Sequence, residues 1–426
     1  DSLKQFMPRF GFAWSPSNSG RRFVVRGHTG IFYAATPLII MSGHTNNFRA
    51  TPGNVSISIV PDTTAGNVRT LYDVFQAVGY DLNQGSLGAL PIIPLDVVQR
   101  AAAFRAGVAA VNPFTGIGID MVAPDFRNPR SFQAGFGAEG ELFGGLIGGV
   151  QLNYVNTVNL HRNRDWNLPA PTPRAGDLRP IFARNNRPIP TLGTFTVRES
   201  SARSMYRGAT LQIQYRRERF QFGTNYTLSE TFSDSDLERD AGGSDYENVF
   251  DLSRDYNYSR LDARHQFNGW AVANLPLGFE VSSLVRARSG YPLNSTVGAD
   301  TNGDTLNTDR PYAAPGVVQE RNAFRNRPYF NTDLRILKDF RFGEVRRLQF
   351  STEFFNLFNT ENVVFNSTGG GTATFFGLGI DPATGQPAAI DPRFRRLRTA
   401  TGGYDPLTTI QQGNPLQVQF GLRLFF

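Results

Sequence analysis

The feature that most constrains the fold is a pair of alternating segments joined by a tight turn. Residues 208–216 place four apolar side chains on one face, namely Ala209, Leu211, Ile213 and Tyr215. After a turn at 217–219 the alternation resumes at 220–228, again with polar residues between the apolar ones. Side chains of a strand point alternately to its two faces, so both segments predict strands with one apolar and one polar face.

The same pattern recurs along the chain and predicts eleven strands. They are expected near residues 6–15, 22–34, 130–139, 148–160, 208–216, 220–228, 262–275, 279–289, 328–341, 346–358 and 415–426. Short turns join them in pairs, and the pairs are separated by long irregular segments at 35–128, 161–204, 232–260, 290–327 and 359–414. Residues 94–111 have a helical pattern, which predicts a small helical excursion within the loop 35–128.

This alternation of short turns and long loops predicts a transmembrane β-barrel. Bacterial barrels keep their short turns in the periplasm and their long loops outside the cell, and their strands alternate lipid-facing apolar with lumen-facing polar residues. No run of about 18 uncharged apolar residues predicts a membrane-spanning helix. We therefore expect an all-β antiparallel barrel that crosses the outer membrane of a Gram-negative cell many times, with long extracellular loops.

The order of turns and loops also bears on the ends of the chain. Bacterial single-chain barrels have an even number of strands and both termini in the periplasm. Here the first and the last predicted strands both run towards the periplasm, because a short turn follows the first one. The sequence therefore predicts that residues 1–426 are the C-terminal part of a longer barrel.

The last strand carries a more specific signal. Its apolar face includes four residues close to the end of the chain, Phe420, Leu422, Leu424 and Phe426. An amphipathic last strand that ends on phenylalanine resembles the signal read by the outer-membrane assembly machinery, whereas the termini of soluble proteins usually fray. We predict that these residues form an assembly signal; the alternative is an ordinary sheet strand that happens to be last.

Charge and histidine distribution exclude several other classes. The formal charge of +7 comes from arginines scattered through strands and loops, so we expect a polar lumen and no nucleic-acid partner. The four histidines are dispersed, and neither a metal-ligand spacing, a G-x-S-x-G elbow nor a Walker loop occurs. The sequence therefore predicts a protein that is not an enzyme and that requires no cofactor.

One loop has the spacing of a candidate cation site. Oxygen side chains stand at positions 1, 3, 5 and 10 of the segment that begins at residue 300, supplied by Asp300, Asn302, Asp304 and Asp309. Ca²⁺ takes six to eight oxygens from alternate positions of a curled loop, as in an EF-hand. The fit is incomplete, since Thr305 replaces the usual glycine and Pro311 the bidentate glutamate. The alternatives are a Ca²⁺ loop and an Asx-rich turn of a solvated loop.

A set of charged residues is expected on the lumen face of the later strands. Its members are Glu280, Arg286, Asp333, Arg335 and Glu353. Charged side chains within a membrane protein usually face the interior and pair with one another. We therefore predict a charged ladder that lines a pore or binds a plug, although the sequence does not say which residues pair.

Eight segments of the predicted strands occur in one order along the chain: Pro8-Arg9-Phe10-Gly11-Phe12-Ala13-Trp14-Ser15-Pro16, Val24-Val25-Arg26-Gly27-His28-Thr29-Gly30-Ile31-Phe32-Tyr33, Tyr226-Thr227-Leu228-Ser229, Asp262-Ala263-Arg264-His265-Gln266-Phe267, Ser289-Gly290-Tyr291-Pro292, Asp333-Leu334-Arg335-Ile336-Leu337-Lys338-Asp339-Phe340, Glu353-Phe354-Phe355-Asn356-Leu357-Phe358-Asn359 and Phe420-Gly421-Leu422-Arg423-Leu424. In residues and order they resemble the Oar-like TonB-dependent receptors with a carboxypeptidase-regulatory-like N-terminal domain.

This resemblance implies a 22-stranded barrel, a plug domain and a short box that engages the TonB complex. The plug and the box are absent from residues 1–426, so the chain matches about half of such a barrel. The implied function is import or export of a bulky solute, with the assembly machinery, lipid, lipopolysaccharide and an unknown extracellular cargo as further partners. The alternatives are a passive porin-like channel and a secreted β-rich adhesion or structural protein.

Overall fold

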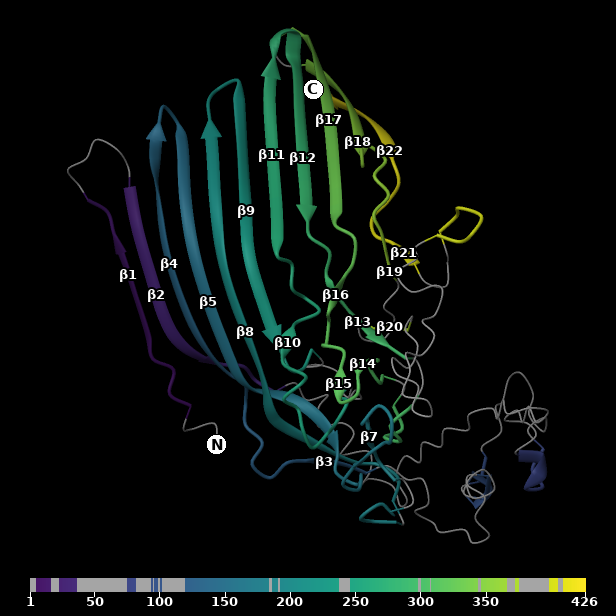
Figure 1. Ribbon diagram of the computed structural model, residues 1–426. Coiled ribbons are helices and arrows are strands. Elements are labelled where there is room, and N and C mark those ends of the chain that lie inside the picture. The colour runs from purple at the N-terminus through teal and green to yellow at the C-terminus, as the bar shows by residue number, and fades with distance from the viewer. Residues whose placement is uncertain are drawn as a thin grey trace.

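A computed structural model of the 426-residue chain describes residues 5–16, 23–36, 75–81, 93–94, 96–98, 100–101, 119–183, 186–190, 192–236, 246–297, 300–306, 308–343, 346–365, 372–374, 398–404 and 409–426. A 13-stranded sheet dominates it (Figure 1). Along the main path the strands are antiparallel neighbours in the order β1 (Arg9–Trp14), β2 (Phe23–Tyr33), β4 (Arg130–Phe143), β5 (Leu146–Asp165), β8 (Phe195–Arg216), β9 (Phe220–Ser233), β11 (His265–Leu275), β12 (Phe279–Arg288), β17 (Tyr329–Phe342), β18 (Arg346–Phe355) and β22 (Gln417–Phe425).

The main path confirms the predicted fold class, and each of its strands coincides with one of the eleven predicted segments. The register also confirms the predicted faces, because Leu211 lies opposite Tyr226 and Ala209 opposite Leu228. Directly opposite residues in an antiparallel pair share a face, so the apolar positions of neighbouring strands form one continuous surface.

Two predicted boundaries are wrong, because the loop assigned to residues 161–204 is partly strand. β5 continues to Asp165 and β8 begins at Phe195. In this extension Asn163 lies opposite Arg198, and Arg164 forms an ion pair with Glu199 at 2.8 Å. Polar residues that pair with one another need no apolar face, so the strands continue where the alternating apolar pattern has stopped.

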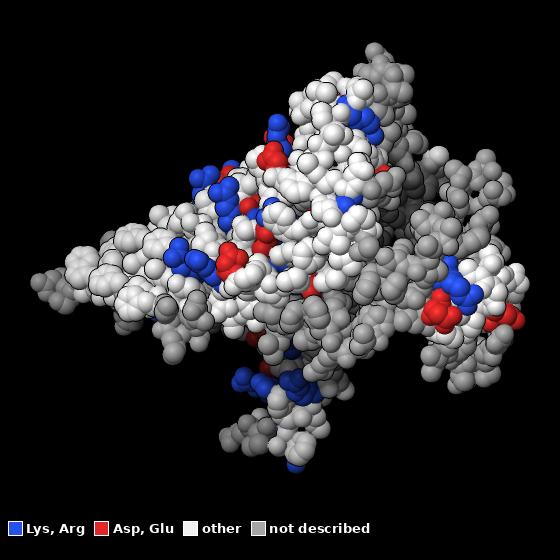
Figure 2. All heavy atoms as spheres, turned by 90° about the horizontal axis from the view of Figure 1, so that it is seen from below, with Lys and Arg blue, Asp and Glu red and all other residues white. Residues whose placement is uncertain are grey.

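The two ends of the sheet differ, as Figure 1 shows. Short turns join β4 to β5, β8 to β9, β11 to β12 and β17 to β18 at one end, and the long connections gather at the other. The turn between β11 and β12 is the short 3-10 element Pro276–Gly278. β1 begins at the loop end, and the C-terminus lies at the turn end (Figure 1). Seen from the loop end, several Lys and Arg side chains lie beside Asp and Glu side chains (Figure 2).

The long connections carry small elements of their own. Two of them join the main sheet: β3 (Ile119–Val122) runs parallel to β8, and β10 (Asn257–Tyr258) pairs with β9. The others form small separate sheets: β6 (Thr172–Pro173), β7 (Pro180–Ile181), β13 (Pro292–Thr296), β14 (Tyr312–Ala314), β15 (Val317–Val318), β16 (Phe324–Arg325), β19 (Val363–Phe365), β20 (Thr372–Thr374) and β21 (Thr409–Gln411).

The predicted helical excursion is described only in part. Within 94–111 the residues 96–98, 100 and 101 are helical, while 102–111 lie outside the described residues. Val97 and Ala101 pack with Phe75 in a small buried cluster. In the described part of the chain no helix is long and apolar enough to cross a membrane.

Among the described residues the buried apolar clusters lie in the loops, while the sheet contributes only single buried residues such as Leu160, Ala202 and Leu337. Leu168, Phe182 and Val249 form a buried cluster among the long connections. By contrast, apolar side chains of the sheet are exposed, with 54% for Leu211 and 71% for Leu422. An exposed apolar surface that spans many strands is typical of a membrane-facing surface.

Candidate functional site

One face of the sheet collects polar and charged side chains, and we call it the polar face. The strand register places on it, from β2 to β22, Arg26, His28, Glu139, Gln151, Gln212, Asn225, Asn268, Arg286, Asp333, Arg335, Glu353 and Gln419. The opposite, apolar face carries Phe136, Val150, Leu152, Leu211, Tyr226, Phe267, Phe350 and Phe420. A barrel wall needs this division, because one of its faces meets lipid and the other meets water.

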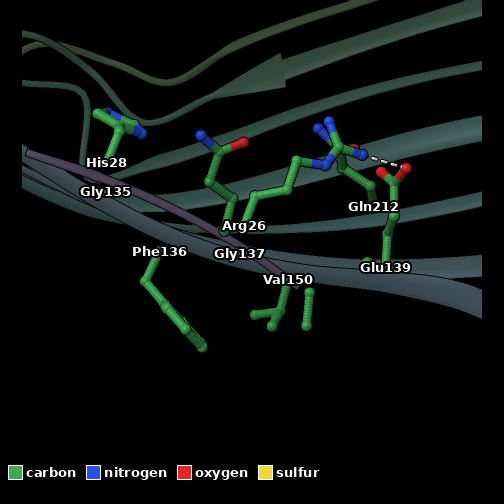
Figure 3. A pocket seen from close by; sticks show the side chains of 11 residues that line it. Arg26, His28, Gly135, Phe136, Gly137, Glu139, Val150 and Gln212 are labelled. Carbon is green, nitrogen blue, oxygen red and sulfur yellow. Dashed lines mark hydrogen bonds and ion pairs between the residues drawn. The ribbon is translucent and has the colours of Figure 1, made fainter. Parts of the chain in front are cut away.

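A hollow in the polar face lies over β2, β4, β5 and β8 and has a volume of about 230 Å³. Figure 3 shows Arg26, His28 and Gln212 pointing to one side of the sheet, and Phe136 and Val150 pointing to the other. Arg26 and Glu139 form an ion pair across the hollow. A Cβ at Gly135 would lie 2.3 Å from the His28 ring, so the glycine makes room for the imidazole.

The five charged residues predicted to form a ladder all fall on the polar face. Arg286 pairs with Asp333 at 3.5 Å, and Arg335 pairs with Glu353 at 3.1 Å. Glu280 lies nearer the turns, opposite Leu337 of β17. The two ion pairs and Trp270 line a second hollow of about 370 Å³. The structure thus supplies the pairing that the sequence left open, while a role in lining a pore or binding a plug stays a prediction.

The predicted assembly signal lies on the last strand of the sheet path. Phe420, Leu422 and Leu424 project from the apolar face of β22, opposite Thr352, Phe350 and Leu348 of β18. Their side chains are well exposed, and Phe426 just beyond the strand is 93% exposed. This placement leaves the four side chains accessible, and recognition by the assembly machinery stays a prediction.

The sequence did not reveal a buried ionic network that ties three long loops together. We call it the loop cluster, and it comprises Arg179, Glu247, Asp255, Arg310 and Tyr312. Arg179 is fully buried, and its Nη1 donates to Glu247 Oε1 at 2.5 Å. The Arg179 guanidinium also lies 4.3 Å from the centre of the Tyr312 ring.

Two further contacts complete the loop cluster. Glu247 Oε2 accepts from the backbone N–H of Arg310 at 3.0 Å, and the Arg310 guanidinium donates to Asp255 Oδ1 at 2.8 Å. The partners are separated by 55 to 68 residues in the sequence, so no short-range motif marks them. The cluster holds the loops after β5, β9 and β12 in one arrangement.

The candidate cation loop at residues 300–309 packs against the loop cluster. Asn302, Asp304 and Asp309 are buried, so the expectation of a solvated loop is wrong. The carboxylates accept backbone hydrogen bonds: Asp300 from Gly303 and Thr305, Asp304 from Leu306, and Asp309 from Thr301 and Asn302. The bond from the Leu306 N–H to Asp304, two residues earlier, is the Asx turn of the second interpretation.

Calcium binding at this loop stays a prediction. Thr305 adopts a φ of 81°, the left-handed conformation that an EF-hand takes at the same position with glycine. Within the described residues, however, no group of three or more His, Cys, Asp or Glu side chains is arranged to hold a metal ion.

The buried carboxylates predict a pH-dependent loop. Burial and, to a smaller extent, the nearby charge of Asp309 raise the pKa of Asp304 from 3.8 to about 7. Burial also raises the pKa of Glu247 to about 7. Because the folded loop binds protons more tightly than the unfolded loop, its stability is highest at low pH and falls as the pH rises through 7.

We therefore expect larger protection factors for the amides of residues 300–312 at pH 5 than at pH 8, where each protection factor is the intrinsic exchange rate at that pH divided by the measured rate. Asp304→Asn, which keeps the size of the side chain, should weaken this dependence. Ca²⁺ added at pH 8 provides a second comparison: restored protection in the wild type but not in Asp304→Asn would support a cation site. Equal protection of the wild-type loop at both pH values would contradict the role of the buried carboxylates.

Comparisons with known proteins show which family the chain matches. The family model described as "Outer membrane beta barrel domain" matches residues 1–319. The chain is similar to the outer membrane transporter YddB from Escherichia coli, with 8% identity, a TM-score of 0.45, and coverage of 95% of this chain and 38% of that one. It is also similar to FpvA of Pseudomonas aeruginosa bound to heterologous pyoverdines, with 10% identity, a TM-score of 0.43, and coverage of 99% and 33%.

A third similar structure is the FrpB iron transporter from Neisseria meningitidis, with 10% identity, a TM-score of 0.40, and coverage of 98% of this chain and 39% of that one. The chain therefore spans about two fifths or less of the length of these solved structures. No curated protein matches it. Because the family model matches residues 1–319 of the 426, the chain belongs to the outer membrane beta-barrel domain family and is a protein of the Gram-negative outer membrane.

Proposed function

We propose that this chain forms part of the barrel wall of a TonB-dependent receptor that moves a bulky solute across the outer membrane. The observation that carries the proposal is the eleven-strand path with one polar and one apolar face. Eleven strands are half of the 22 found in outer-membrane transporters whose lumen is plugged. The strand segments that resemble Oar-like receptors support the same assignment.

The edges of the sheet fit a larger barrel. β1 and β22 end the path, and in the part of the chain that the structure describes they do not pair with each other. A sheet edge exposed to lipid leaves backbone groups unsatisfied, which a membrane does not tolerate. We propose that further strands of the same protein close the barrel and that its plug domain sits against the polar face.

The polar face is suited to hold a plug in a reversible way. Its ion pairs are partly exposed, with side-chain exposures of 50% for Arg286 and 39% for Arg335. Exposed ion pairs contribute only about 0–1 kcal/mol each. A plug domain held by these exposed charged side chains and by glutamines of the polar face would be bound weakly. A small mechanical force could then release it, and we propose that the TonB complex supplies this force. In this function the chain takes part in transport and performs no catalytic step.

The test uses a photo-crosslinking amino acid at two neighbouring positions of the native, full-length protein. At Gln212 the probe lies in the hollow of the polar face, and at Leu211 it lies on the apolar face. We expect the Gln212 probe to crosslink, after irradiation in cells, to a segment of the same polypeptide outside this sequence. The Leu211 probe should react with lipid instead.

A passive channel gives a different outcome. It predicts no crosslink from Gln212 to a plug and a steady ion conductance when the protein is placed in a planar bilayer. That pair of results would overturn the receptor proposal in favour of a porin-like channel.

A further inference from the structure

A cluster of arginines interrupts the apolar face near its loop end. Arg203 and Arg207 lie two residues on either side of Met205 in β8, so the three side chains share a face. Arg207 lies opposite Tyr154 of β5 and Glu230 of β9, and Tyr154 is two residues from Leu152 of the apolar face. The side chain of Arg264, which precedes β11, reaches the same Glu230.

The height of this cluster matches the edge of the membrane. Arg207 stands nine residues before Arg216, the last residue of β8 at the turn end. At about 3.4 Å per residue this is roughly 31 Å along the strand. With a strand tilt of about 40° it becomes about 24 Å along the membrane normal, close to the roughly 25 Å height of the apolar band. Arg207 therefore lies level with the headgroups of the outer leaflet, and Arg203 lies four residues further towards the loop end.

The guanidiniums face outwards, whereas the carboxylates that hold them are shielded. The side chains of Arg203 and Arg207 are 60% and 61% exposed, against 9% for Asp234 and 13% for Glu230. Glu230 is shared by Arg207 and Arg264, and Asp234 is shared by Arg162 and Arg203. Arg162 is buried, but the other three guanidiniums are exposed and meet only two carboxylates, which leaves a positive excess at the surface.

An apolar notch lies directly below the arginines. Ala209 sits between Leu152 and Leu228 in one register row across β5, β8 and β9. Together with Arg207, Glu230 and Arg264 these residues line a hollow of about 350 Å³. Aromatic rings flank the cluster, since Tyr256 stacks with Arg203 at 4.4 Å. Aromatic side chains at this height are typical of a membrane interface.

We propose that this surface binds a phosphorylated lipid of the outer leaflet, with the headgroup phosphate on Arg203, Arg207 and Arg264 and an acyl chain in the notch at Ala209. Arginine matches phosphate because its planar guanidinium donates two parallel hydrogen bonds. The apolar notch lies below the cationic arginines. A single amphipathic anion, with a charged headgroup and an apolar chain, can contact both surfaces at once. The site lies on the outer, lipid-facing surface of the barrel wall. Lipid binding there does not depend on the proposed transport function.

The test measures the lipid that stays bound to the full-length protein, by native mass spectrometry after extraction in mild detergent. Bis-phosphorylated lipid A, its dephosphorylated form and inorganic phosphate are the three probes. We expect the wild type to retain the phosphorylated lipid. The double variant Arg207→Gln/Arg264→Gln should retain at least about tenfold less of it. Ala209→Leu, which fills the notch and leaves every ion pair intact, should also reduce retention.

Arg286→Gln on the polar face is the matched control and should retain the lipid as the wild type does. Equal retention of the phosphorylated and dephosphorylated lipids would overturn the proposal, as would unchanged retention in Arg207→Gln/Arg264→Gln. Displacement of the lipid by inorganic phosphate alone, with no effect of Ala209→Leu, would indicate a site for free anions and would also overturn it. Heat-modifiable mobility on gels shows whether each variant has folded.

Discussion

Arg179→Met should release the loop cluster while leaving the strands in place. The guanidinium is fully buried, and its removal leaves Glu247 without its charge partner in the protein interior. Removing one member of a buried ion pair typically costs about 3–5 kcal/mol. We therefore expect fast amide exchange and rapid proteolysis of the loops around residues 166–183 and 300–312, with the strands still protected.

Two further variants test whether the loss of the buried ion pair causes the loss of loop protection. Arg398→Met breaks an ion pair with Glu361 in which both side chains are more than half exposed, so the loops should keep the protection that they have in the wild type. Arg179→Met/Glu247→Gln removes both charges and keeps an acceptor for the Arg310 backbone, and it should recover part of the lost protection. If Arg179→Met is as well protected as the wild type, the network does not hold the loops together.

The second large effect is expected from a charge placed on the apolar face. Leu211 stands five residues before Arg216, about 17 Å along the strand, or about 13 Å along the membrane normal for a tilt near 40°. That height is close to the membrane midplane, where an arginine on the lipid side costs about 2–4 kcal/mol. Leu211→Arg should therefore lower the free energy of unfolding by this amount.

Gln212→Arg is the matched control, since it adds the same charge one residue away on the polar face. Its cost should stay within about 0.5 kcal/mol, as for a surface substitution. Denaturant unfolding of the protein in lipid vesicles measures both values. Equal costs for Leu211→Arg and Gln212→Arg would mean that the two faces do not meet different environments.

The strands could be predicted from the sequence because their signal is local. Alternation of apolar and polar residues within ten positions is enough to place Leu211 and Gln212 on opposite faces, and the register confirms it. The signal is lost where both faces become polar, which is why the extension of β5 to Asp165 was missed.

The loop cluster could not be predicted for a different reason. Arg179 and Glu247 are 68 residues apart, and each looks like an ordinary loop charge in its own surroundings. The segment 300–309 was recognised as a set of Asx residues, but its burial depends on contacts such as the bond from the Phe182 N–H to the Asn302 carbonyl. Only the folded loops bring these distant segments together.

The direct test of a membrane-spanning sheet with its long loops outside is cysteine labelling. The chain contains no cysteine, so each introduced thiol is unique within it. Leu261 lies in a long loop and is 70% exposed, and Leu277 lies in the β11–β12 turn and is 83% exposed. A membrane-impermeant maleimide added to intact cells should label Leu261→Cys and not Leu277→Cys, and permeabilised cells should show both labelled. Labelling of Leu277→Cys in intact cells, to the same extent as Leu261→Cys, would contradict the account.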